Sequence, residues 1–406
     1  MLMGKMFLAI VLLVCLTIAV PASGQEIKRK NRDKQPSSVA LATGKIIPVE
    51  IPITNQIYVQ ARINNSELMW FILDTGATWT ILDVDKANEL KIRSEGKRSL
   101  NLGQTNTVTT TFAKDASLDI SGIRVPVEQL AVMPAKFRHA PQIVGLIGSD
   151  LFKRFVVEID YIAKTIKLFE PKNYEYMGHG ERLPFEIIEE IPHIVVNISK
   201  GDVNSLPAKL LLDTGASQTI LIYSPFVEKN KLLETTNGTV KLAAGGLGGG
   251  NLIYKGRAKA VRVGNIVFEN PLIDFSTTRG AADRRDGIIG NGLLNRFKLI
   301  VNYSRKQVIL EPTERFNVAT DFDFFLFKVI QDGNTYKIGD MFQASMAGKA
   351  GLKIGDVLLA IDGKQVSSLS LGEIQRMFMM DGRDRVLSVK RGEEILEIKL
   401  QTFRIF

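Results

Sequence analysis

Short apolar or alternating runs, separated by Gly, Asn and Pro, dominate the chain from Ile46 to about Glu311. Two examples are the segments 57–63 (IYVQARI) and 193–198 (HIVVNI). A period of two between apolar positions is typical of a β-strand with one buried face. Few stretches carry the 3.6-residue period of a long helix. The pattern therefore predicts a mainly β protein over this region.

One strand-and-turn pattern occurs twice in the chain. The apolar run 70–73 (WFIL) precedes the string DTGATWTIL at 74–82, and the apolar run 210–212 (LLL) precedes DTGASQTIL at 213–221. The two strings differ at only two positions. Each copy predicts a buried strand that ends on an aspartate, Asp74 in the first and Asp213 in the second.

A second motif follows each copy at nearly the same distance. It reads VGLIG at 144–148 and DGIIG at 286–290, and both halves later close on a Glu-Pro pair. Internal similarity over such a length indicates repeated structural units. The sequence predicts two homologous lobes, residues 46–171 and 182–312.

The pattern changes again after Phe316. Residues 347–363 (AGKAGLKIGDVLLAIDG) predict a turn, a short strand and another turn. Helical spacing follows at 371–378, and strand patterns lie at 386–389 and 395–400. We interpret residues 320–402 as a separate small α+β module.

The N-terminal residues have the pattern of a targeting segment. Lys5 precedes an apolar run at 7–20, and small residues follow at 22–24. Such a run is shorter than the ~20 helical residues that span a bilayer. We expect residues 1–24 to be a cleaved signal peptide and the protein to be exported, periplasmic or secreted. An uncleaved anchor and lipidation at Cys15 are the alternatives. Residues 25–45 are polar and basic and predict a flexible lead.

Composition and net charge serve mainly to exclude classes of function. The chain has 406 residues, of which 45% are hydrophobic and 23% charged, as expected for several globular domains. The formal net charge is +9, but no nucleic-acid-binding motif accompanies it, so we expect no nucleic-acid partner. The single cysteine, Cys15, lies in the predicted signal peptide. A disulfide scaffold and a cysteine nucleophile are therefore not expected in the mature chain.

Two aspartates at the ends of equivalent strands suit hydrolysis by an activated water. Carboxyl groups about 3 Å apart cannot both ionise, so they share a proton and supply both a base and an acid. We predict that Asp74 and Asp213 form this catalytic pair. The threonine that follows each can bond across the lobes, the glycine permits close approach, and the alanine keeps the next position small. These positioning residues are Thr75, Gly76 and Ala77 in the first lobe and Thr214, Gly215 and Ala216 in the second.

Other candidate chemistry is weaker. A single Asp-Thr-Gly is a common turn, and only its repetition favours catalysis. The histidines His139, His179 and His193 do not have the spacing of metal ligands, so we expect no metal and no other cofactor. Trp79 could line a subsite or pack within its lobe, and packing is favoured.

Each lobe is also expected to carry a hairpin that closes over substrate. The candidate in the first lobe surrounds Gly103, and the candidate in the second is a glycine-rich tract that contains Gly246 and Gly248. A phosphate-binding loop and a passive loop are the alternatives for the second tract. The phosphate loop is disfavoured, because no Lys-Ser/Thr pair follows.

The repeated DTGA, with an apolar-apolar-Gly element downstream, resembles the retropepsin-like aspartic peptidases of bacteria. The resemblance implies two pseudo-twofold-related β-barrel lobes, with the apolar element packed beneath each aspartate turn. Family members usually pair two chains, whereas this chain carries both lobes, so we expect a monomer; an enzyme active only as a homodimer is the alternative. Ala77 and Ala216 stand where pepsin-like enzymes have a hydroxyl, which implies a raised pKa for the pair and a weakly acid optimum.

Residues 347–363 are similar to the PDZ domains of bacterial secreted proteases. The resemblance implies a groove that binds a peptide ligand as an added strand. The stretch 322–327 stands where the carboxylate-binding loop is expected, but it lacks glycine and contains Asp323. A peptide-binding role and a packing role both stay open.

These features together predict an aspartic endopeptidase that hydrolyses peptides or proteins. The alternative is an inactive peptidase fold that binds peptides or partner proteins through its cleft and its PDZ-like domain.

Overall fold

The structure is a computed structural model that describes residues 44–52, 54–102, 106–137, 140–200, 204–236, 239–246, 249–278, 285–317, 327–341, 346–379 and 384–400. The predicted signal peptide, 1–24, and almost all of the predicted lead, 25–45, lie outside these residues, so export stays a prediction. Across the described ranges, none of the helices has the length and apolar character needed to span a bilayer.

The first lobe is a seven-stranded sheet in the order β2-β3-β8-β4-β7-β6-β5. An additional pairing between β2 and β6 closes the sheet into a barrel-like shape. Alternate residues of its strands point inward, as Val59, Ala61 and Ile63 of β2 do. The elements are β2 (Tyr58–Ile63), β3 (Met69–Leu73), β4 (Ile81–Asp83), α1 (Val84–Glu89), β5 (Glu95–Leu102), β6 (Asn106–Ile120), β7 (Ile123–Met133), β8 (Ile143–Ile147) and α2 (Ser149–Phe152).

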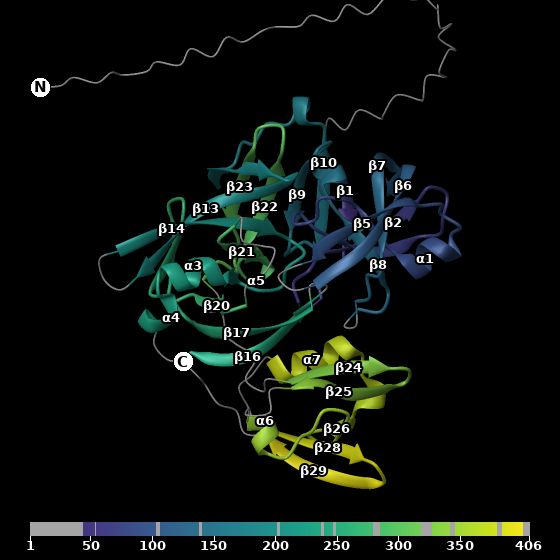
Figure 1. The fold of residues 1–406 in the computed structure, drawn as a ribbon, viewed down its shortest axis with the longest axis vertical. Coiled ribbons are helices and arrows are strands. Elements are labelled where there is room, and N and C mark those ends of the chain that lie inside the picture. The colour runs from purple at the N-terminus through teal and green to yellow at the C-terminus, as the bar shows by residue number, and fades with distance from the viewer. Residues whose placement is uncertain are drawn as a thin grey trace, which may run out of the picture. The chain divides into compact units, whose positions relative to one another are not determined.

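The second lobe repeats this design in a ten-stranded sheet. The order is β16-β17-β20-β15-β21-β14-β13-β18-β19, and β12 pairs with β13. The strands β16 and β17 form a long hairpin (Figure 1). The elements are β12 (Glu186–Ile188), β13 (Ile191–Lys200), β14 (Asn204–Asp213), β15 (Ile220–Ile222), α3 (Ser224–Lys229), α4 (Leu232–Thr235), β16 (Val240–Gly246), β17 (Gly249–Arg257), β18 (Ala260–Val263), β19 (Ile266–Glu269), β20 (Leu272–Ser276), β21 (Gly287–Gly290) and α5 (Asn291–Leu294).

A six-stranded sheet contains strands from both halves of the repeat. Its central pair, β9 and β22, is antiparallel, with Ile159 opposite Leu299, and both residues are fully buried (Figure 1). This continuous ladder of backbone hydrogen bonds joins the two lobes. The elements are β1 (Lys45–Pro48), β9 (Val156–Asp160), β10 (Thr165–Phe169), the 3-10 helix η1 (Pro171–Asn173), β11 (Glu181–Pro184), β22 (Phe297–Asn302) and β23 (Gln307–Pro312).

The element downstream of each aspartate packs beside the strand that carries it. In the first lobe β8 lies between β3, to which it is parallel, and β4, to which it is antiparallel. In the second lobe β21 lies between β14 and β15 in the same way. The close approach requires glycine, because a Cβ on Gly145 would lie 1.9 Å from the Ile81 carbonyl oxygen, and one on Gly287 would lie 2.1 Å from that of Leu221. Each motif thus forms a strand against the aspartate-bearing strand and approaches the turn that follows it.

The C-terminal domain has its own hydrophobic core, which includes Ile338, Leu358, Ile374 and Leu387. Its strands follow the order β24-β25-β26-β28-β29, with β27 paired to β26. The predicted carboxylate-binding stretch lies outside the described residues except for Phe327. The elements are β24 (Phe327–Asp332), β25 (Thr335–Met341), α6 (Met346–Lys349), β26 (Val357–Ile361), β27 (Lys364–Gln365), the 3-10 helix η2 (Val366–Ser368), α7 (Leu371–Met379), β28 (Arg385–Arg391) and β29 (Glu394–Leu400).

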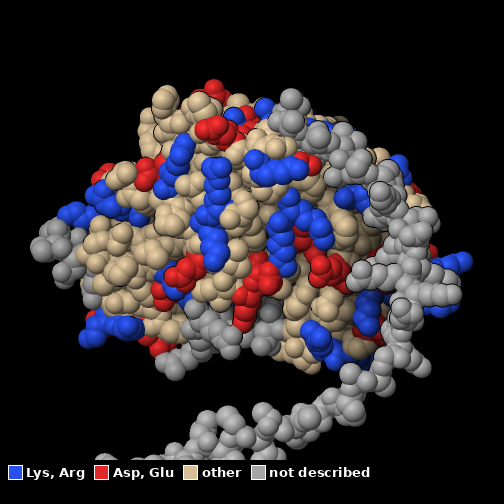
Figure 2. All heavy atoms as spheres, turned by 90° about the horizontal axis from the view of Figure 1, so that it is seen from above, with Lys and Arg blue, Asp and Glu red and all other residues tan. Residues whose placement is uncertain are grey.

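The fold is mainly β, with two barrel-like lobes and a small third domain, as the sequence predicts. On the face drawn in Figure 2, Lys and Arg side chains gather near the middle, with Asp and Glu side chains directly beside them.

Candidate active site

Asp74 and Asp213 meet where the two lobes join. Asp74 follows the last residue of β3, and Asp213 is the last residue of β14. A Cβ added to Gly76 would lie 2.8 Å from Cγ of Asp213, and one added to Gly215 would lie 2.4 Å from Cγ of Asp74. The two carboxyl groups also hydrogen-bond to each other. The structure thus brings together the predicted pair, and each glycine is needed because the opposite carboxyl group occupies the space of its side chain.

Backbone N–H groups stabilise both carboxyl groups, and the Gly215 N–H acts on Asp74 as well as on Asp213. The N–H of Gly76 donates to Oδ1 of Asp74 over 2.7 Å. Oδ1 of Asp213 accepts two such bonds, from Gly215 over 2.9 Å and from Ala216 over 3.0 Å. Hydrogen bonds to an ionised carboxylate stabilise it. Asp213 is the better-stabilised anion of the pair, because the hydrogen bond between the two carboxyl groups lowers its pKa and raises that of Asp74.

The pKa values of both aspartates are raised. Burial, followed by the negative charge of Asp213, raises the pKa of Asp74 well above its ordinary value. Burial also raises the pKa of Asp213, while the Gly215 N–H and the hydrogen bond from Asp74 oppose this increase. Because the two groups interact strongly, they titrate as a unit. A pair that retains one proton above the usual carboxyl range can act as base and acid in weakly acid solution.

The two threonines form a reciprocal set of hydrogen bonds between the lobes. The Thr75 hydroxyl donates to the Leu212 carbonyl over 2.5 Å and accepts from the Thr214 N–H over 3.0 Å. The Thr214 hydroxyl donates to the Leu73 carbonyl over 2.8 Å and accepts from the Thr75 N–H over 3.0 Å. Both threonines are fully buried. The contact predicted across the pseudo-twofold axis is present on both sides.

Three residues near the pair escaped sequence reasoning. Gln56 of the first lobe donates from Nε2 to the Gly215 carbonyl over 2.6 Å. Asn291 of the second lobe donates from Nδ2 to the Thr214 carbonyl over 2.5 Å, and its Oδ1 accepts from the Tyr161 hydroxyl over 2.6 Å. The sequence held only two signals for these residues. Asn291 directly follows the DGIIG motif, and Tyr161 lies at a matched position in the repeat.

We expect Asn291→Ala to destabilise the protein by about 2–5 kcal/mol, because it leaves both the buried Tyr161 hydroxyl and the Thr214 carbonyl without a partner. Tyr161→Phe should cost less, since it leaves only Oδ1 of Asn291 unpaired. Thermal unfolding of the two variants beside the parent protein measures the difference. Equal melting temperatures for the parent and Asn291→Ala would contradict the assigned role.

Trp79 packs within the first lobe. Its ring contacts Phe112 edge to face, with 5.3 Å between ring centroids, beside a cluster of buried apolar residues. The structure therefore favours the packing interpretation.

The predicted substrate-covering hairpins coincide with β5–β6 and β16–β17. Gly103 and Gly248 lie outside the described residues, and Gly246 is the last residue of β16. Their contact with substrate stays a prediction.

The histidines lie in different settings. His193 is buried and bonded to the Ile191 carbonyl, and burial together with the charge of Arg285 lowers its pKa to about 4. His179 is exposed, and His139 lies outside the described residues. In the described part of the chain, no three or more His, Cys, Asp or Glu side chains gather in a way that could hold a metal ion.

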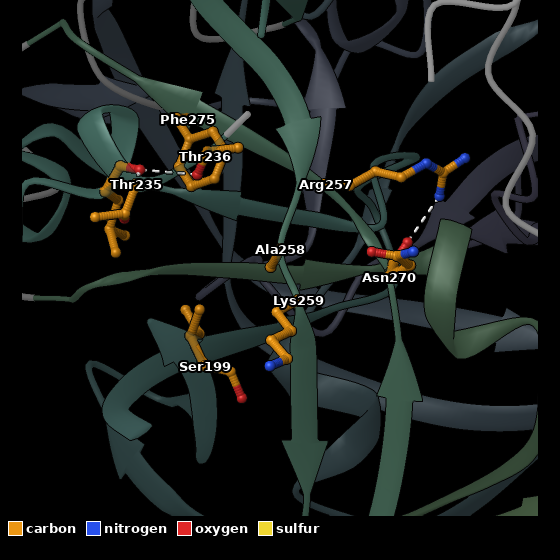
Figure 3. Close-up of a pocket in the computed structure, with 10 residues that line it drawn as sticks. Ser199, Thr235, Thr236, Arg257, Ala258, Lys259, Asn270 and Phe275 are labelled. Atoms are coloured by element: carbon orange, nitrogen blue, oxygen red, sulfur yellow. Dashed lines mark hydrogen bonds between the residues drawn. The ribbon is translucent and has the colours of Figure 1, made fainter. Parts of the chain in front are cut away.

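A cavity of about 370 Å³ lies in the second lobe, and neither aspartate lines it (Figure 3). Its wall includes Ser199, Thr236, Lys259 and Phe275. Arg257 in the same wall donates to the Asn270 carbonyl over 2.7 Å. The cavity is thus separate from the aspartate pair.

Family models match segments of both lobes and of the C-terminal domain. No curated protein matches the chain. Among solved structures, the aspartic proteinase from Irpex lacteus matches 68% of this chain and 100% of its own, with 15% sequence identity and a TM-score of 0.43. The family model described as aspartyl protease matches residues 59–151 and again 199–293, and the PDZ domain model matches residues 343–391. The chain therefore contains two aspartyl protease repeats, each with one aspartate of the pair, and a PDZ domain that follows them.

Proposed function

We propose that the protein is an aspartic endopeptidase that hydrolyses peptide bonds with a water held between Asp74 and Asp213. The observation that carries the proposal is the hydrogen-bonded pair of carboxyl groups, one from each repeat, of which Asp74 is buried and Asp213 is partly buried. The ionised carboxyl group of the pair takes a proton from the water as it attacks the peptide carbonyl. The protonated partner donates to the carbonyl oxygen, and the pair then returns a proton to the leaving amine.

The single shared proton sets the pH range of this mechanism. Below the first pKa of the pair both carboxyl groups are protonated and no base exists. Above the second pKa both are ionised and no acid exists. Because burial and mutual repulsion raise the pKa of Asp74, the active form persists above the ordinary carboxyl range. The N–H groups of Gly215 and Ala216 and the hydrogen bond from Asp74 oppose the rise in the pKa of Asp213, which favours Asp213 as the ionised member of the pair.

We expect the purified mature chain to cleave a broad peptide mixture between pH 3 and 8, with a maximum in weakly acid solution. Mass spectrometry of the products gives the rate at each pH and the bonds cut. The double variant Asp74→Asn/Asp213→Asn serves as the control for a contaminating protease. A maximum below about pH 3 would refute the inferred ionisation. No cleavage at any pH by a folded chain would favour a peptide-binding protein instead.

A further inference from the structure

Gln56 of the first lobe contacts the turn that carries Asp213. Its Nε2 donates to the Gly215 carbonyl over 2.6 Å. The Ala216 N–H, which belongs to the same peptide group as that carbonyl, donates to Oδ1 of Asp213 over 3.0 Å. A peptide group is planar and almost always trans, so its carbonyl and its N–H point in opposite directions. A bond that fixes the direction of the Gly215 carbonyl therefore also fixes the N–H that donates to Asp213.

A second hydrogen bond orients the Gln56 amide. The Thr54 hydroxyl donates to Oε1 of Gln56 over 3.2 Å. Because Oε1 takes the bond from Thr54, the NH₂ group on the other side of the amide is left to donate to the Gly215 carbonyl. The Gln56 side chain is thus held at both polar ends of its amide group.

The backbone on both sides of Gln56 is fixed by hydrogen bonds. Asn55 has a left-handed φ of 58°, a conformation that Asn adopts more readily than most residues. Its N–H donates over 2.9 Å to the carbonyl three residues earlier, which closes a turn. On the other side the Ile57 carbonyl accepts from the Leu73 N–H over 2.9 Å, and Leu73 directly precedes Asp74. The position of Gln56 is therefore tied to the strand that leads to Asp74.

The corresponding position of the second lobe holds a residue without a side-chain donor. Strand pairing aligns Tyr58 of β2 with His193 of β13, because each stands opposite the residue two positions before the aspartate of its own lobe. Counting back two residues from each gives Gln56 in the first lobe and Ile191 in the second. An isoleucine side chain cannot donate a hydrogen bond. Gln56 therefore supports one catalytic turn in a way that Ile191 cannot support the other.

The N–H group that Gln56 orients acts on the ionised form of Asp213. Burial raises the pKa of Asp213, and the Gly215 N–H, the hydrogen bond from Asp74 and the Ala216 N–H oppose this rise. A hydrogen bond to the carbonyl of a peptide group polarises that group and strengthens the bond that its N–H donates. Loss of the Gln56 bond should therefore raise the first pKa of the pair.

Other ionisable groups also lie near the pair. Arg285, Tyr223 and Tyr303 interact electrostatically with one aspartate or the other. Burial raises the pKa values of both tyrosines, so their phenols are neutral in weakly acid solution, and an arginine stays charged. His193, which pairs with the strand of Asp213, titrates at lower pH, because burial lowers its pKa to about 4. A neutral replacement of Gln56 leaves all four groups in place.

We propose that Gln56 is a positioning residue of the active site, which holds the Gly215–Ala216 peptide group in the orientation that stabilises ionised Asp213. This inference rests on the proposed peptidase function. In this arrangement Asp213 takes a proton from the water as the water oxygen attacks the peptide carbonyl carbon. The proton of Asp74 passes to the carbonyl oxygen. Gln56 acts through the peptide group and takes no part in proton transfer.

The variant Gln56→Met tests the proposal, because it removes the donor and keeps the length of the side chain. We expect kcat to fall by about 3- to 10-fold, with KM nearly unchanged. The acid limb of the kcat profile should move to higher pH by about 0.5 to 1 pH unit. Gln60→Met, the same change at an exposed position of β2, is the matched control and should keep the rate and the profile of the parent protein.

A parent-like pH profile in Gln56→Met would overturn the proposal even if the variant were less stable, because a purely structural contact does not change the ionisation of the pair. A higher KM with unchanged kcat would also overturn it, since Gln56 would then act on the substrate. Thr54→Val is a milder variant that frees the Gln56 amide and keeps its donor. It should move the acid limb in the same direction by a smaller amount. If Gln56→Met does not fold, a parent-like profile in Thr54→Val would overturn the proposal.

A measurement without substrate separates failure of this proposal from failure of the peptidase function. Urea unfolding of the parent protein and of Gln56→Met is compared at a series of pH values from 3 to 7. The destabilisation caused by Gln56→Met should increase as pH rises through the first pKa of the pair, because Gln56 stabilises the anion. A difference that does not depend on pH, together with cleavage by the parent protein, would overturn the role of Gln56 while the peptidase function stands. The expected pH dependence without any cleavage would support the role of Gln56 and refute the peptidase function.

Discussion

Replacing either aspartate by asparagine should lower kcat by about 10⁴-fold or more, because the pair supplies both the base and the acid of one reaction. Asp74→Asn and Asp213→Asn should cause losses of similar size, and the double variant should lose little more than either alone. This non-additivity is expected when two groups act as a unit. Initial rates on a peptide cut by the parent protein provide the measurement. A variant that retained a tenth of the parent activity would exclude that aspartate from the chemistry.

Asp74→Asn should also change the stability of the protein, and this change can be measured without a substrate. The pKa of Asp74 is raised in the folded protein, so its contribution to stability is complete below the unfolded pKa and is lost as pH rises through the folded pKa. Asp74→Asn removes this loss, since the amide stays neutral. The variant should therefore be more stable than the parent protein near pH 7, and the difference should vanish near pH 3. Urea unfolding at both values of pH measures it, and an equal difference at both would contradict the raised pKa.

Thr75→Val should destabilise the protein by roughly 2–6 kcal/mol and lower activity with it. The valine leaves the Leu212 carbonyl and the Thr214 N–H buried without partners, at about 1–3 kcal/mol each. These groups join the second lobe to the turn that carries Asp74. The substitution therefore weakens both the fold and the alignment of the two carboxyl groups.

Thr75→Ser is the matched control, because it keeps the hydroxyl and removes only a methyl group. Urea unfolding followed by fluorescence is informative, since Trp70 and Trp79, the two tryptophans of the chain, both lie in the first lobe. We expect Ser to retain most of the stability that Val loses. Similar unfolding midpoints for the two variants would show that the hydroxyl contributes little across the lobes.

The sequence was sufficient to predict that Asp74 and Asp213 meet, because each half of the site is a local feature. A buried strand that ends on Asp, followed by Thr, Gly and Ala, specifies its own turn within a few residues. Repetition of that turn, with the same glycine motif downstream, implies a pseudo-twofold arrangement. In that arrangement Thr75 and Thr214 are expected to make reciprocal hydrogen bonds, and the observed hydrogen bonds are of this kind.

The supporting contacts could not be predicted in this way. Gln56 reaches Gly215, and Tyr161 reaches Asn291, across sequence separations of more than a hundred residues. A polar residue finds such a partner only after the strands have paired, and nothing in its local sequence identifies that partner. Which N–H groups reach each aspartate likewise depends on the geometry of the two turns.

The repeat, the mainly β fold and the two aspartates follow from the sequence alone, because the period of the apolar positions and the shape of a turn depend on neighbouring residues. The strand register of the second lobe depends instead on the tertiary structure. In an alignment of the two DTGA segments, Ile81 corresponds to Ile220. In the parallel strand pairs, Ile81 of β4 stands opposite Ala131, whereas Leu221 of β15 stands opposite Asp274. A shift of one residue in a strand exchanges its two faces. Which residue of β15 stands opposite Asp274 is therefore set by strand pairing between distant segments.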